Sequence, residues 1–166
     1  PKESLSMERS LTISWDDPAA YAELPADMSF LDIFRAVAAG ELPQAPIGRL
    51  MGFDILEVEE GRAVVTGRPG EQHCNPNGYA HGGYAATLLD AAMYCAIATS
   101  LRGRTPWTTI ELKINYIRPL GPATGLVRAE GRAIHVGRRA GTAEGRLLDA
   151  AGKLYAHGTT SCMVGA

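Results

Sequence analysis

The chain has little cysteine, and what it has is scattered. Its 166 residues include 3 cysteines, which stand far apart and form no C-x-x-C pair: Cys74, Cys95 and Cys162. An odd, dispersed set is typical of reduced thiols, so we expect a cytoplasmic protein without disulfides. A chain of this length buries enough apolar surface to fold without disulfides or structural metals.

The chain also has no large excess of positive or negative charge. The 16 Lys and Arg residues nearly balance the 18 Asp and Glu residues, and no run of five or more like charges occurs. A nucleic-acid-binding protein carries a basic patch or stripe, so we expect no nucleic-acid partner. The longest apolar run, residues 84–101, contains Asp90 and falls short of the ~20 residues of a membrane span. With no secretory signal visible at the polar start, we expect no membrane partner.

Three motifs of common enzyme classes are absent: G-x-S-x-G, the P-loop and G-x-G-x-x-G. Their absence argues against a serine hydrolase, an NTPase and a dinucleotide-binding enzyme. His73, Cys74 and His81 do not reproduce the ligand spacing of a structural zinc site, and a fourth ligand is not evident. We therefore expect neither a metal nor a cofactor.

The first part of the chain looks helical. The stretches DDPAAYAEL and DMSFLDIFRAVAAGEL place helix-start residues ahead of apolar residues at helical spacing. Four apolar residues would share one helix face: Phe30, Ile33, Phe34 and Val37. That face should pack on the rest of the chain. Because Pro43 and Pro46 then break the chain, we expect a helical extension over residues 1–47 and a main domain over residues 48–166.

From Gly52 the pattern changes to short strands bounded by glycine or proline. Two runs, FDILEVEEG and RAVVTGRPG, predict a hairpin turning at Glu60-Gly61. A helix is expected from about Gly82 to Leu101, followed by four more strand runs: TTIELKINYIRP, GLVRAEGRAIHVG, AGTAEGRLLDAAG and KLYAHGTTSCMVG. Such an order is neither alternating β-α units nor a pure sandwich. It predicts an α+β fold, a curved antiparallel sheet wrapped around one apolar helix.

The expected helix is apolar on nearly every side, and only Thr87 and Asp90 interrupt it. An unpaired carboxylate in such surroundings is costly unless it is hydrogen-bonded or meets solvent in a cleft. Asp90 therefore has two possible roles. It is a structural group, which lies at the helix surface or is hydrogen-bonded to a strand, or it is a catalytic base in a cleft. We favour the catalytic interpretation because desolvated carboxylates in clefts are candidate bases.

Gly82 and Gly83 stand where this helix should begin. Glycines there leave the first N–H groups open to an oxyanion, although a turn or close packing would also explain them. Asp90 lies ~12 Å farther along the helix, too far for both ends to act on one carbonyl. If both are catalytic, they should come from different subunits of a two-fold dimer.

One pattern is specific in its combined spacing. It reads Asn75-x-x-Gly78-x-x-His81-Gly82-Gly83, with Asp90 farther along. This pattern resembles the PaaI-type acyl-CoA thioesterases of the hotdog-fold superfamily, as do the strand from Thr109 to Pro119 and the chain ending. The resemblance covers about Gly48 to Val164. It implies a sheet around a helix, dimers or dimers of dimers, and hydrolysis of an acyl-CoA thioester at the subunit interface.

The resemblance also implies residue roles. The Gly82 N–H would polarise the thioester carbonyl, Asn75 would assist it or hold water, and Asp90 would act as general base or nucleophile. His81 would either hydrogen-bond near the leaving sulfur or fix the loop. Thr109 would orient the water, unless it is only a strand residue.

Coenzyme A carries phosphates, so the mouth of its pocket should offer basic side chains. The best candidate is the run His135-Val136-Gly137-Arg138-Arg139 between two strands, and the alternative is a solvated turn. We expect Gly83 to bind substrate as well, beside Gly82.

Two other functions stay open. A non-catalytic acyl-CoA or acyl-carrier binding module would keep the pocket without turnover. Dehydration of a hydroxyacyl thioester would need a second well-placed carboxylate, which the pattern lacks. The acyl group, aromatic or aliphatic, is also open, as is whether the N-terminal helices cap the pocket.

Overall fold

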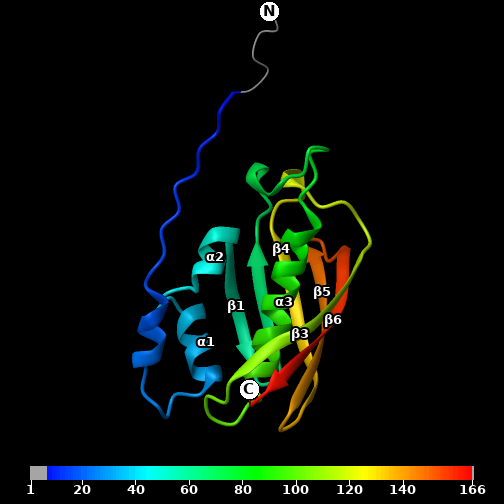
Figure 1. Cartoon of the computed structure of the whole chain (residues 1–166). Helices are drawn as coiled ribbons and strands as arrows, with labels where there is room; N and C mark the ends of the chain where they lie inside the picture. Colours follow the sequence, from blue (N-terminus) through cyan, green and yellow to red (C-terminus); the bar gives the residue numbers. More distant parts are fainter. Residues whose placement is uncertain (1–6, 166) are drawn as a thin grey trace, which may run out of the picture.

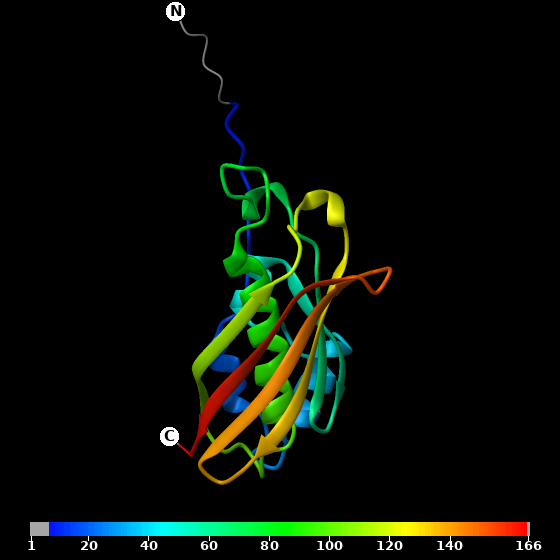
Figure 2. The ribbon, with the colours of Figure 1, turned by 90° about the vertical axis from the view of Figure 1, so that its right-hand side faces the viewer.

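A curved antiparallel sheet wraps around one long helix (Figure 1, Figure 2). The computed structural model describes residues 7–165; residues 1–6 of the expected extension and residue 166 lie outside them. The strands are β1 (Phe53–Glu59), β2 (Arg62–Gly67), β3 (Trp107–Tyr116), β4 (Val127–Val136), β5 (Ala140–Asp149) and β6 (Leu154–Val164). They pair antiparallel in the order β1-β2-β4-β5-β6-β3. The predicted α+β fold is confirmed.

The long helix is α3 (Gly82–Ala98), which His81 caps. It ends before the predicted Leu101 because the buried Thr99 turns its hydroxyl back onto the chain. Thr99 Oγ1 donates to the Ala96 carbonyl at 2.8 Å and accepts the Gly61 N–H at 2.9 Å. A side chain that bonds the backbone in this way competes with further helical turns, and here it ties the helix end to the β1–β2 turn.

A row of glycines lets the sheet approach the helix. Gly131 of β4 lies opposite Gly145 of β5, which lies opposite Gly158 of β6. A Cβ at Gly131 would lie 2.3 Å from the Ala92 carbonyl oxygen, and one at Gly145 would lie 2.9 Å from Met93 Cγ. The absence of side chains at Gly131 and Gly145 therefore lets α3 lie close to the sheet, whereas a Cβ at Gly158 would meet the Lys113 carbonyl oxygen of β3.

The segment before β1 forms three short helices: η1 (Pro18–Glu23), α1 (Phe30–Ala38) and α2 (Pro46–Met51). The first predicted helix is a single 3-10 segment. Ser29 begins α1 in a reciprocal capping pair with Asp32. The sequence did not predict α2, where Pro46 starts a helix instead of breaking the chain, because the first turn needs no N–H from that residue.

The two edges of the sheet differ. At one edge α1 and α2 lie alongside β1 (Figure 1), and the apolar face of α1 packs against the core as predicted, with Ile33 buried. At the other edge β3 pairs only with β6 within residues 7–165. Two apolar side chains of β3 are exposed, Ile110 at 62% and Leu112 at 36%.

No helix among residues 7–165 is both long and apolar enough to cross a membrane.

Candidate functional site

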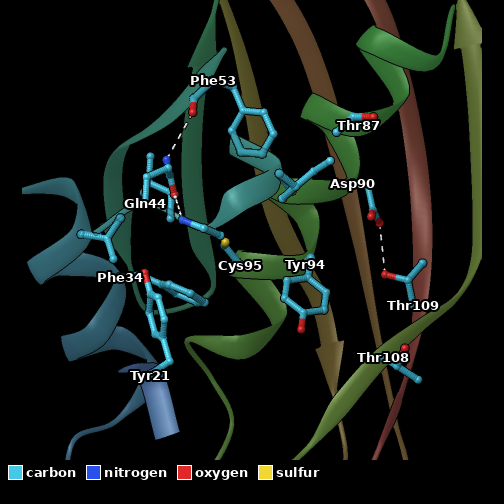
Figure 3. Close-up of a pocket in the computed structure, with 15 residues that line it drawn as sticks. Tyr21, Phe34, Gln44, Phe53, Thr87, Asp90, Tyr94, Cys95, Thr108 and Thr109 are labelled. Carbon is cyan, nitrogen blue, oxygen red and sulfur yellow. Dashed lines mark hydrogen bonds between the residues drawn. The ribbon is translucent and has the colours of Figure 1, made fainter. Parts of the chain in front are cut away.

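Asp90 projects from the middle of α3 toward β3 (Figure 3). Its carboxylate Oδ1 accepts a hydrogen bond of 3.1 Å from Thr109 Oγ1. Burial raises the pKa of Asp90 above its usual range, while the Thr109 hydrogen bond opposes that rise because it favours the charged form. A carboxylate in these surroundings accepts a proton more readily than an exposed one.

A cavity of about 490 Å³ opens beside this carboxylate, and we call it the Asp90 cavity. Most of its wall is apolar or aromatic. Its lining residues are Tyr21, Phe34, Val37, Gln44, Ala45, Ile47, Phe53, Ile55, Thr87, Asp90, Ala91, Tyr94, Cys95, Thr108 and Thr109. Such walls suit the apolar part of a small ligand, with Asp90 and Thr109 as polar groups at one side.

The start of α3 presents an unused donor. Within residues 7–165 the Gly82 N–H has no hydrogen-bond partner, whereas the Gly83 N–H donates to His81 Nδ1 at 3.0 Å. Because Nδ1 accepts, the ring proton of neutral His81 lies on Nε2, which is then a second donor beside Gly82. His81 thus shapes the turn, and its far nitrogen remains available.

Gly82 and Asp90 lie in different cavities. A second cavity, of about 340 Å³, is lined by His81, Gly82, Tyr116 and Arg118 among others, and Asp90 is not part of its wall. Tyr116 closes over the helix start, where its hydroxyl donates to the Gly82 carbonyl at 3.0 Å. The structure brings Asp90 together with Thr109, and Gly82 together with His81, but it does not unite the two pairs within one chain.

Asn75 holds the loop that leads to His81. Its side-chain oxygen accepts the Asn77 N–H at 2.9 Å, and its own N–H donates to the Tyr79 carbonyl at 2.8 Å. Gly78 lies in this turn with φ of 80°, a conformation that favours glycine. The Asn75 oxygen is therefore committed to the loop, and its side-chain NH₂ is the group left for a ligand.

The basic run lies at the opposite end of α3 from His81. His135 and Val136 end β4, and Gly137–Arg139 form the turn into β5, which lies near the end of α3 (Figure 1). A cavity of about 380 Å³ there is lined by Arg138, Gly137 and also Arg102. Neither Asp90 nor Gly82 of the same chain lies in its wall.

Several lining residues were not singled out from the sequence. Tyr94 follows Asp90 by one helical turn, so the rule that such residues share a helix face would have found it. No local signal marks Tyr21 or Gln44, which reach the cavity through the fold. Among residues 7–165, no three His, Cys, Asp or Glu side chains group closely enough to hold a metal ion.

Comparison with known proteins agrees with this architecture. The family model of the thioesterase superfamily matches residues 77–156. The chain is 32% identical over 104 residues to a 1,4-dihydroxy-2-naphthoyl-CoA hydrolase of Listeria monocytogenes, a match that covers 63% of this chain and 83% of the relative.

Solved structures show the same fold. A mutant of the phenylacetic acid degradation protein PaaI from Thermus thermophilus has a TM-score of 0.65 at 31% identity, covering 72% of this chain and 98% of that one. A Streptococcus mutans protein bound to acetyl CoA has a TM-score of 0.62 at 25% identity, covering 68% and 88%. The chain belongs to the thioesterase superfamily, with the hotdog fold and a resemblance to its PaaI-type members.

Proposed function

We propose that the protein is an acyl-CoA thioesterase whose catalytic site forms between two subunits. Its family is one of thioester hydrolases. The observation that carries the proposal is the separation of Gly82 and Asp90 into two cavities. Each cavity holds one part of a hydrolytic site, a donor for the carbonyl oxygen or a base, and two-fold pairing supplies the missing part.

The proposed chemistry begins with the thioester carbonyl at the start of α3. As water attacks the carbonyl carbon, negative charge develops on the oxygen, and the free Gly82 N–H together with the helix dipole stabilises it. Asp90 of the other subunit takes the proton of the water. The carbon–sulfur bond then breaks, and the thiolate leaves as free CoA after receiving a proton. Direct attack by the Asp90 carboxylate would use the same geometry.

The exposed edge of β3 is the proposed contact between subunits. An edge strand with free backbone groups and apolar side chains is a template for pairing with another strand. Strand β3 is such an edge strand, and its exposed apolar side chains are Ile110 and Leu112. Two copies of β3 paired antiparallel would also turn the two α3 helices in opposite directions. The start of one helix would then approach the middle of the other.

Support for a CoA substrate comes from charge and from relatives. Arg102 and Arg138 line one small cavity at the end of α3, a set of donors that suits phosphates. One relative is named as a CoA hydrolase, and one neighbour was solved with acetyl CoA. We place the phosphates at this turn, with His135, Gly137 and Arg139 as its other members, and the acyl group in the Asp90 cavity.

Subunit complementation tests the shared site. Asp90→Asn removes the base, and Gly82→Pro removes the N–H at a first helical position where proline fits, since His81 before it has an extended ψ of 142°. Each variant alone should lose thiol release, by about 10²–10³-fold for the N–H. Co-expressed with separable tags, the mixed dimer should regain one of its two sites, about half of the wild-type activity per dimer.

Gly82→Ala is the matched control, because it meets the same Tyr116 ring as proline but keeps the N–H. It should retain far more activity than Gly82→Pro. No recovery in a purified mixed dimer would place both groups in one chain and overturn the proposal. The alternative, a non-catalytic acyl-CoA or acyl-carrier binding module, predicts saturable binding of acyl-CoA without any thiol release by the wild-type protein.

A further inference from the structure

Part of the wall of the Asp90 cavity comes from the segment that precedes the strands. Six lining residues belong to it: Tyr21, Phe34, Val37, Gln44, Ala45 and Ile47. These residues stand before Gly48 and outside the stretch that matches the family model. Phe34 and Gln44 lie across the cavity from Asp90 and Thr109 (Figure 3).

Gln44 attaches this wall to β1. Gln44 is only 7% exposed; its Nε2 donates to the Phe53 carbonyl at 3.2 Å, and its Oε1 accepts the Ala45 N–H at 3.0 Å. Gly48 makes room for it, because a Cβ there would lie 2.7 Å from Gln44 Cγ. A buried amide held by two backbone groups and close packing fixes the position of the wall.

The other end of the segment is tied to the loop before β3. Arg104 donates to the Leu24 carbonyl at 3.0 Å and to the Tyr21 carbonyl at 3.4 Å. The Phe30 ring packs edge-on against Trp107, with centroids 4.2 Å apart. Contacts with β1 and with β3 hold the segment at both ends, where it forms one wall of the cavity.

We infer that α1 sets the size of the acyl group that the protein accepts, and that Phe34 is the residue that limits it. The inference rests on the proposed function, since it places the acyl group in the Asp90 cavity. With its thioester at Asp90, an acyl group points its tail at the wall that carries Phe34. An aromatic ring at this wall favours short and compact acyl groups and hinders long chains that would have to extend past it.

The test uses S-alkyl-CoA thioethers with short, medium and long chains, which lack the carbonyl that a thioesterase attacks. Their dissociation constants are measured by titration calorimetry on the full chain. The wild-type protein should bind the shorter analogues and lose affinity for the long one. Phe34→Ala should tighten binding of the long analogue by about 10-fold or more, because one or two methylenes in an apolar pocket are worth that much.

Phe30→Ala is the matched control. It removes the same atoms from the same helix, but Phe30 is not part of the cavity wall: its ring packs against Trp107 and lies beside the Phe34 ring, with centroids 6.2 Å apart. Its chain-length profile should change far less than that of Phe34→Ala, because Phe34 still lines the cavity. The inference is overturned if Phe34→Ala leaves the profile unchanged, if Phe30→Ala shifts it equally, or if the wild-type protein binds none of the analogues.

Binding and turnover separate this inference from the proposed function. Thioether binding needs no base, so a profile that shifts with Phe34→Ala supports the wall even if the protein releases no thiol from any acyl-CoA. If the wild-type protein releases thiol but Phe34→Ala leaves the chain-length profile of binding unchanged, the proposed function stands. The inference that Phe34 limits the size of the acyl group is then wrong.

Discussion

Two opposing influences act on the Asp90 carboxylate. Burial on α3 raises its pKa, and the hydrogen bond from Thr109 lowers it. The first makes Asp90 a better proton acceptor, and the second keeps more of it charged and therefore able to accept a proton near neutral pH. The resemblance predicted that Thr109 orients a water; the contact with Asp90 adds a reason for a hydroxyl at this position.

Thr109→Val removes this hydroxyl while it keeps a β-branched strand residue. Loss of a hydrogen bond to the charged form raises the pKa of Asp90 further. If Asp90 is the base, the acid limb of kcat/KM against pH should move to higher pH, because the carboxylate must be ionised. Thr109→Ser keeps the donor and should leave the limb in place. An acid limb that stays fixed in Thr109→Val would exclude Asp90 as the titrating base.

At the scale of elements, α3 packs closely on the sheet where the strands carry glycine. Gly131, Gly145 and Gly158 lie side by side on three strands, and the first two face α3. At Gly131 the neighbour is helix backbone, which cannot move without moving the helix. At Gly145 the neighbours are the side chains of Met93 and Leu89, which are flexible.

Gly131→Ala should therefore destabilise the protein by about 1–3 kcal/mol, the usual cost of overpacking a core. Gly145→Ala should cost less, because its new Cβ meets the side chains of Met93 and Leu89, which can shift more easily than helix backbone. The free energy of unfolding, measured in urea for both variants under the same conditions, checks the difference. Equal losses would mean that the contact with helix backbone is not what requires glycine at residue 131.

The elements themselves were predictable where a local pattern repeats. Six strand runs and the long helix were read from periodicity and from glycine and proline boundaries. The short α2 was missed, because Pro46 signals both a break and a first helical turn. The glycine row has no signature along the chain, since it exists only once the strands are paired in register.

At the scale of the whole molecule, the candidate site is assembled from distant parts of the chain. The pattern around Gly82 and Asp90 predicted the family and proposed the chemistry, and the distance along one helix favoured two half-sites. The wall was not predictable, because Gln44 meets Phe53 and Arg104 meets Tyr21 through contacts that no local pattern encodes. If the Asp90 cavity holds the acyl group as proposed, the acyl preference depends on these contacts more than on the catalytic pattern.

A substitution that prevents pairing between two copies of β3 should abolish both dimer formation and thiol release. Ile110→Lys places a charge on the edge strand, which discourages strand pairing. Sedimentation should show smaller particles than the wild type, with thiol release lost in the same preparation. Ile134→Lys is the control: Ile134 is 61% exposed, against 62% for Ile110, but it lies on β4, which has a neighbouring strand on each side. If Ile110→Lys matches this control in size and activity, the interface lies elsewhere.

The difference between the two edge strands, β1 and β3, also limits how many copies of the chain can join through strand pairing. A sheet with two open edges can add chains without end, which is the geometry of a fibril. Among residues 7–165, α1 and α2 lie alongside β1, whereas no strand pairs with the outer side of β3. Strand addition between copies would then use up both free edges at once and stop at a pair. The segment that lines part of the Asp90 cavity would thereby also protect the protein from open-ended aggregation.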